Sequence, residues 1–124
     1  MIRYLTDRKR AKGLGAGRQG THHHWQMMVT SMLLVVLVPA FIITFAIGLG
    51  GTQEEVAAYF ARPFPAIITI LALVVGIFHL MNEAIAAVED YVHGMAGKLA
   101  IVAVTAVSYL LMAAGVFAVA KMAL

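Results

Sequence analysis

The stretch "GIFHLMNEAIAAVEDYVHG", residues 76–94, decides how this chain folds and where its chemistry lies. It begins as an apolar run that contains one histidine, His79, and eleven residues later it reaches Asp90, followed by Tyr91. At ~100° per residue, eleven residues turn a helix through three turns plus about 20°, with a rise of ~16 Å. The spacing therefore predicts that His79 and Asp90 lie on nearly the same face of one helix.

The composition is that of an integral membrane protein. Of the 124 residues, 62% are hydrophobic and 12% are charged, and the mean hydropathy is +0.90. An ordinary soluble domain has about 25% charged residues. Three apolar runs are each long enough to cross a hydrocarbon core of ~30 Å as a helix, which takes roughly 20 residues. The predicted fold is all-α, with three transmembrane helices, up-down-up, at about residues 25–49, 64–91 and 97–121.

The distribution of charge predicts the orientation of these helices. Residues 1–24 are polar and basic, and "GLGAGRQG" within them is too rich in glycine for a stable helix, so we expect a flexible cytoplasmic arm. The first connection holds Glu54 and Glu55 against a single Arg62, whereas the second holds Lys98. Because Lys and Arg accumulate on the cytoplasmic side, the amino terminus is predicted inside and the carboxyl terminus outside.

Other features predict how the helices meet their surroundings. Trp25, Tyr59 and Phe60 fall where interfacial aromatic residues belong. The apolar runs are rich in small residues, which allow helix backbones to approach closely. We therefore expect the chain to pack against other membrane helices. The chain has no cysteine, so it can hold no disulfide, iron–sulfur cluster or thioether-linked haem.

An ionisable residue at membrane depth, such as His79, is costly and normally faces a bundle interior, a cavity or a ligand. Its imidazole could hydrogen-bond to a neighbouring helix, transfer protons or bind a haem iron. A six-coordinate haem would need its second axial ligand from another subunit, since the remaining histidines fall at or outside the cytoplasmic boundary: His22, His23, His24 and His93. Glu83, one turn from His79, is expected to hydrogen-bond to a neighbouring helix or to water.

The Asp90-Tyr91 pair at the cytoplasmic end of the helix allows two interpretations. A tyrosine at a membrane boundary is usually an anchor. A phenol can also donate a hydrogen bond to a quinone carbonyl, and a neighbouring carboxylate can orient that phenol or relay protons from water. Both interpretations stay open from the residues alone.

Together these residues resemble the smaller membrane anchor subunits of bacterial succinate dehydrogenase, respiratory complex II. The resemblance rests on His79, ten intervening residues and then Asp90-Tyr91. It extends over nearly the whole chain, through the basic arm, "GTHHHW" at residues 20–25, Thr30 and the three helices. It implies that His79 is an axial ligand of haem b, shared with a larger anchor subunit. It also implies that Tyr91 hydrogen-bonds ubiquinone, with Asp90 beside it.

The resemblance further implies the setting of the chain. It would be a non-catalytic anchor in the bacterial cytoplasmic membrane, with its amino terminus cytoplasmic and its carboxyl terminus periplasmic. A flavoprotein subunit would oxidise succinate, and an iron–sulfur subunit would pass the electrons to ubiquinone, linking the tricarboxylic acid cycle to electron transport. The remaining contacts would be with membrane lipid, and no nucleic acid partner is expected.

One position departs from the pattern of this family. Members often carry an arginine two residues before the threonine, where it meets a haem propionate, and here that position is Met28. Arg18 or His24 could substitute for that arginine only if the arm folds back. His22, His23 and His24 are expected to be interfacial polar residues, and a propionate contact by one of them is the alternative. Two other functions are compatible with the residues: a small proton-coupled transporter subunit that uses His79 and Glu83, and a haem-free structural anchor.

Overall fold

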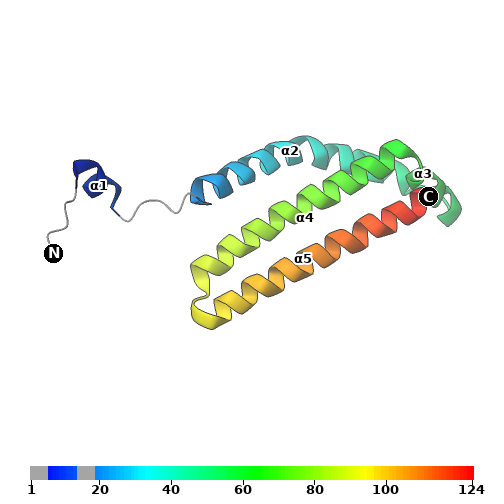
Figure 1. The fold of residues 1–124 in the computed structure, drawn as a ribbon. Coiled ribbons are helices and arrows are strands. Elements are labelled where there is room, and N and C mark those ends of the chain that lie inside the picture. The colour runs from blue at the N-terminus through cyan, green and yellow to red at the C-terminus, as the bar shows by residue number, and fades with distance from the viewer. Residues whose placement is uncertain (1–5, 14–18) are drawn as a thin grey trace.

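Three long helices make up most of the chain. The computed structural model describes residues 6–13 and 19–124. All regular structure within these residues is helical: three helices are long and apolar enough to span a membrane, α2 (Gln19–Gly48), α4 (Pro63–Tyr91) and α5 (Gly94–Ala123). Two further helices are short, α1 (Asp7–Lys12) and α3 (Gln53–Phe60). The predicted all-α membrane fold with three helices running up-down-up is confirmed (Figure 1).

The central helix of the bundle is α4. Helices α2 and α5 each pack against α4 and, within the described residues, not against each other. The connection between α4 and α5 lies at the same end as the start of α2, while α3 and the carboxyl terminus lie at the other end (Figure 1). In the most apolar stretch of α4, 22% of the residues are buried, compared with 11% in α2 and in α5. Much of the bundle surface is therefore left for lipid or for other helices.

The amino-terminal region differs from its prediction in two ways. Helix α2 begins at Gln19 rather than at about residue 25, so residues 19–24 extend the spanning helix and do not belong to a flexible arm. Part of the arm also forms helix α1, because the Oγ1 of Thr6 accepts a hydrogen bond from the backbone N–H of Lys9 at 3.3 Å. Residues 14–18, which include most of the glycine-rich stretch, lie outside the described residues.

Helix α2 curves along its length in Figure 1. Pro39 lies inside it and has no backbone N–H to donate to the carbonyl four residues earlier. A proline ring also clashes with that carbonyl, which bends a helix at this point. The curvature thus has a cause in the sequence.

The first connection contains a helix that the sequence prediction did not include. Helix α3 starts with a capping box, in which Thr52 N donates to Glu55 Oε2 at 2.8 Å and Glu55 N donates to Thr52 Oγ1 at 3.4 Å. Phe60 at the end of α3 is only 4% exposed, and its ring centroid lies 5.9 Å from that of Phe45 on α2 in a tilted arrangement. A Cβ at Gly48 would lie 2.8 Å from ring atoms of Phe60 and of its neighbour, so glycine allows α3 to fold against α2.

Two glycines at the start of α5 allow the tight turn from α4. Gly94 has φ +73°, which an L side chain rarely adopts. A Cβ at Gly97 would overlap the backbone carbonyl of Val92. At the other end of α4, Pro63 occupies the first turn, where its missing N–H costs little, as predicted.

Candidate functional site on the central helix

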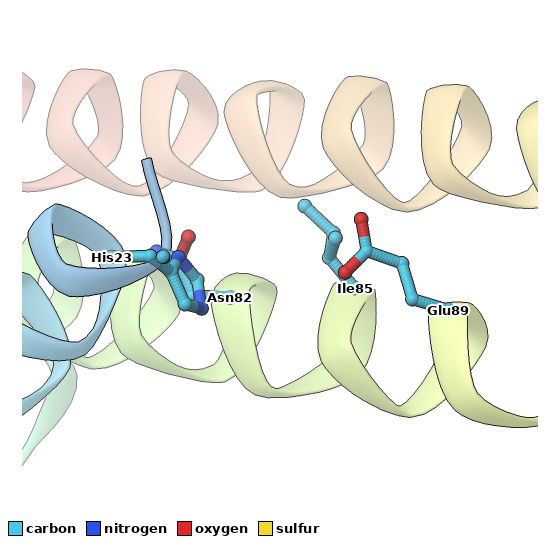
Figure 2. A pocket seen from close by; sticks show the side chains of 5 residues that line it. His23, Asn82, Ile85 and Glu89 are labelled. Atoms are coloured by element: carbon cyan, nitrogen blue, oxygen red, sulfur yellow. The ribbon is translucent and has the colours of Figure 1, made fainter. Parts of the chain in front are cut away.

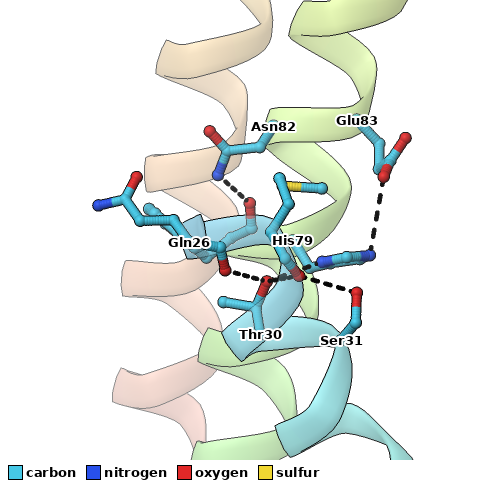
Figure 3. Close-up of polar contacts among 8 residues, drawn as sticks. Gln26, Thr30, Ser31, His79, Asn82 and Glu83 are labelled. Atoms are coloured by element: carbon cyan, nitrogen blue, oxygen red, sulfur yellow. Dashed lines mark hydrogen bonds and ion pairs between the residues drawn. The ribbon is translucent and has the colours of Figure 1, made fainter. Parts of the chain in front are cut away.

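His79 lies in the middle of α4 and reaches across to α2. Its Nδ1 is 2.9 Å from the Oγ1 of Thr30, a side-chain hydrogen bond between the two helices (Figure 3). Its side chain is only 18% exposed. The first of the three roles considered for this histidine, a hydrogen bond to a neighbouring helix, is therefore observed. That bond uses one ring nitrogen and leaves the other for a second role.

The second ring nitrogen, Nε2, faces the next turn of α4. It lies 4.0 Å from the Oε1 of Glu83, a distance too long for a hydrogen bond (Figure 3). The Glu83 side chain is 61% exposed, and within the described residues its carboxyl has no hydrogen-bond partner on a neighbouring helix, in contrast to one of its predicted roles. A carboxyl exposed on a spanning helix requires a polar group from water, from lipid or from another subunit.

Thr30 holds its place on α2 through its own helix. Its Oγ1 donates toward the carbonyls of Gln26 at 2.9 Å and Met27 at 3.1 Å, the usual bonds of a threonine inside a helix. The sequence pointed to Thr30 only as part of a family pattern. The sequence could not show that Thr30 and His79, 49 positions apart, lie at the same depth on facing helices.

A polar pocket of about 320 Å³ lies between the start of α2 and the carboxyl-terminal half of α4 (Figure 2). Its lining residues are Gly20, His23, Asn82, Ile85 and Glu89. Asn82 is 9% exposed, and its Nδ2 donates to the carbonyl of Phe78 at 2.8 Å. The pocket brings His23 of α2 together with Asn82 of α4, which follows His79 by about one helical turn.

The histidine that lines this pocket is not the one that the sequence favoured. His24 is exposed, whereas His23 is half-buried and lies seven residues, or two helical turns, before Thr30. Residues seven apart share a face of a helix, so this spacing was the signal that could have identified His23. Met28, at the position of the family arginine, is 38% exposed and has no donor for an anion.

Asp90 and Tyr91 occupy the last two positions of α4. The helix is unbroken from His79 onward, so Asp90 keeps the face shared with His79, while Tyr91 is rotated about 100° further. Both side chains are exposed, Tyr91 to 84%. Neither lines the pocket beside His23, and they form a separate pair at the carboxyl-terminal end of α4 that another subunit could cover.

The described part of the chain holds no multi-ligand metal site. Residues 6–13 and 19–124 contain no cluster of three or more His, Cys, Asp or Glu that could hold a metal ion. A haem iron needs only one axial imidazole from a chain when a second chain supplies the other. His79 offers one such imidazole.

Comparisons with known proteins agree over almost the full length of the chain. The profile of the family described as "Succinate dehydrogenase/Fumarate reductase transmembrane subunit" matches residues 3–120. The chain is 43% identical over 123 residues to the succinate dehydrogenase hydrophobic membrane anchor subunit of Paracoccus denitrificans, which covers 99% of this chain and 95% of the relative. No solved structure matches the chain significantly. The chain thus belongs to the family of succinate dehydrogenase and fumarate reductase transmembrane subunits.

Proposed function

We propose that the chain is the smaller membrane anchor subunit of a succinate:ubiquinone oxidoreductase. In this role it binds haem b together with a larger anchor subunit and forms part of the ubiquinone site. The observation that carries the proposal is the state of His79, whose Nδ1 is hydrogen-bonded to Thr30 while Nε2 has no partner within hydrogen-bond distance among the described residues. Family membership supports the anchor role.

The residues around His79 fit an axial haem ligand. Histidines that bind metals usually donate their other ring N–H to a fixed acceptor, and the hydroxyl of Thr30, 2.9 Å from Nδ1, can act as such an acceptor. When bound, the haem would supply an iron that accepts and releases one electron. Donors for its propionates would come from the histidines at the start of α2. His24 was the predicted candidate, and the inward position of His23 beside Asn82 makes it the stronger one.

The ubiquinone site is assigned to Tyr91 and Asp90. The phenol of Tyr91 would donate a hydrogen bond to a quinone carbonyl, and the carboxylate of Asp90 would orient the phenol or pass protons from water. Their exposure at the end of α4 supports this assignment, because the quinone and the iron–sulfur subunit would have to approach from outside this chain. The reduction of a quinone requires two protons, and this end of the helix lies nearest to water.

The proposed partners follow from the same assignment. A larger anchor subunit would cover the face of α4 that carries His79 and Glu83, where a polar carboxyl is exposed on a spanning helix. An iron–sulfur subunit and a flavoprotein subunit would bind at the end with Tyr91. Succinate oxidation would take place on the flavoprotein, so this chain contributes no catalytic residue to it. The membrane would be the bacterial cytoplasmic membrane, with the amino terminus inside.

An optical redox spectrum of the complex purified with its partner subunits tests the proposal. We expect a b-type haem spectrum, altered in His79→Ala and unchanged in His93→Ala, a matched control because His93 is exposed outside the spanning helices. A complex with no haem would favour a haem-free structural anchor. Haem that is insensitive to His79→Ala would refute ligation by His79, and proton-coupled transport dependent on His79 and Glu83 would favour a transporter subunit.

A further inference from the structure

The hydroxyl of Thr30 has three neighbours and only one proton. Its Oγ1 lies 2.9 Å from the Gln26 carbonyl, 3.1 Å from the Met27 carbonyl and 2.9 Å from His79 Nδ1. The carbonyls can only accept, so the usual bond of a threonine to its own helix uses the hydroxyl proton. The remaining contact then requires that Nδ1 carries a hydrogen and donates it to a lone pair of Oγ1.

The surroundings of Nε2 favour the same tautomer. If Nε2 carried the hydrogen, it would have no acceptor within hydrogen-bond distance in the described part of the chain, since Glu83 Oε1 is 4.0 Å away. An N–H without an acceptor is costly inside a membrane. With the hydrogen on Nδ1, the N–H is satisfied by Thr30, and Nε2 keeps its lone pair free on the side of the ring away from that hydroxyl.

We infer that Thr30 is a positioning residue that holds His79 in the Nδ1–H tautomer and fixes the ring so that Nε2 is the iron-binding atom. This inference rests on the proposed haem ligation by His79. Thr30 touches neither iron nor quinone in this role. It acts through the imidazole, whose orientation and basicity depend on the acceptor at Nδ1. The branched Cβ of threonine restricts its rotamers, which keeps the hydroxyl facing His79.

The bond predicts the direction of a redox effect. An acceptor on Nδ1–H increases the electron density that the imidazole donates, and this stabilises the more positive ferric state. Loss of the acceptor should therefore raise the reduction midpoint potential of the haem. Outer-sphere partners of metal-binding histidines change metal affinity by about 10–100-fold. We take the lower figure, about tenfold, for the change in affinity for ferric relative to ferrous iron. A tenfold change corresponds to ~59 mV in the reduction potential of the haem, a one-electron couple.

The experiment is a potentiometric titration of haem b in the purified complex, combined with EPR spectroscopy of the ferric state, whose g values depend on ligand orientation. Thr30→Val keeps the shape and removes the acceptor, while Thr30→Ser restores a hydroxyl. Thr105→Val is the matched control, because the Oγ1 of Thr105 on α5 makes the same kind of bond to its own helix, at 2.8 Å to Ile101. We expect a raised potential and altered g values in Thr30→Val alone.

Three results would overturn the inference: an unchanged potential in Thr30→Val, an equal shift in Thr30→Ser, or an equal shift in Thr105→Val. If Thr30→Val does not assemble, Thr30→Ala removes the same acceptor with a smaller side chain and is judged by the same criteria. Failure of the proposed function has a different signature, which is the absence of b-type haem or its insensitivity to His79→Ala. A haem that depends on His79 but not on Thr30 refutes only the positioning role.

Discussion

Nε2 of His79 and Oε1 of Glu83 lie 4.0 Å apart on adjacent turns of α4. The distance exceeds a hydrogen bond, and the Glu83 side chain is 61% exposed, so the contact holds neither group firmly. We expect Glu83→Gln to leave haem content and quinone reductase activity within about twofold, or ~0.4 kcal/mol, because glutamine keeps the size of the side chain and the substitution breaks no hydrogen bond of the carboxyl to His79. Assays of both on the purified complex check this. Abolished activity with normal haem would instead indicate that the Glu83 carboxyl handles protons.

The orientation of the chain gives a second prediction. The start of α2 and the α4–α5 connection lie at one end of the bundle (Figure 1); the basic helix α1 precedes α2 in the chain, and Lys98 lies near the start of α5. The positive-inside rule then places this end in the cytoplasm. A reporter that is active only in the periplasm should be active when fused after Leu124 and inactive when inserted at Met95. The reverse pattern would refute the placement of Tyr91 beside cytoplasmic subunits.

Two threonines of the spanning helices should respond differently to the same substitution. The Oγ1 of Thr69 on α4 is buried and has no hydrogen-bond partner in the described residues, whereas that of Thr30 bridges two helices. Removing an unpaired buried hydroxyl relieves a desolvation cost, so Thr69→Val should be neutral or stabilising by up to about 1 kcal/mol. Thr30→Val should destabilise by about 0.6 kcal/mol, the average for such bonds in membranes, or somewhat more.

Thermal unfolding of the purified complex measures both effects. The unfolding midpoint of Thr69→Val should equal or exceed that of the unaltered complex, and that of Thr30→Val should be lower. If Thr69→Val were the more destabilising of the two, the hydroxyl of Thr69 would have a partner in the assembled complex.

The spanning helices could be predicted from the sequence because long apolar runs have few alternatives in a membrane, where backbone groups must be satisfied within the helix. The start of α2 could not be predicted in this way. Hydropathy marks where apolar residues begin, but backbone hydrogen bonding continues through polar residues, and α2 includes "HHH" for that reason. Helix α3 was missed because eight residues that begin with two glutamates are too short to form an apolar run, and the helix is fixed by its capping box and by burial of Phe60.

The candidate site was predictable along one helix and not across two. The spacing of His79 and Asp90 follows from helical geometry alone, and α4 runs unbroken between them. The contact between His79 and Thr30 depends on the axial offset between α2 and α4, that is, on the register of their packing. That register follows from the packing of α2 against α4 along their length, which no local sequence pattern encodes.

The turn that follows Tyr91 gives a prediction for Gly97. A Cβ at this position would overlap the Val92 carbonyl, and its distance to the Val92 carbonyl carbon would be 3.2 Å. Because backbone atoms cannot move aside as a side-chain tip can, Gly97→Ala should destabilise the complex by about 1–3 kcal/mol. Gly50→Ala is the matched control, since a Cβ there meets nothing within 4 Å. Equal yields and unfolding midpoints for the two variants would contradict this packing.

Tyr91 and His79 should give separable phenotypes when altered. Tyr91→Phe keeps the ring, which is 84% exposed and packs little within this chain, and removes only the hydroxyl. If that hydroxyl donates to the quinone, its loss should reduce quinone reduction by about tenfold, corresponding to ~1.4 kcal/mol for one hydrogen bond. Asp90→Asn should act in the same direction, because it removes the carboxylate that orients the phenol or relays protons. Haem content and spectrum should stay normal in both variants, since ~16 Å of helix separates Asp90 from His79.

The measurement that decides the role of Tyr91 compares two electron acceptors in one preparation. Succinate-dependent reduction of a ubiquinone analogue should fall in Tyr91→Phe, while reduction of an artificial acceptor that takes electrons before the quinone site should not. Tyr109→Phe is the matched control, because Tyr109 is a 56% exposed tyrosine on α5 outside the proposed site. A parallel loss with both acceptors would indicate poor assembly. Unchanged quinone kinetics in Tyr91→Phe would leave Tyr91 as an interfacial anchor, and the quinone site would then have to be formed by the partner subunits.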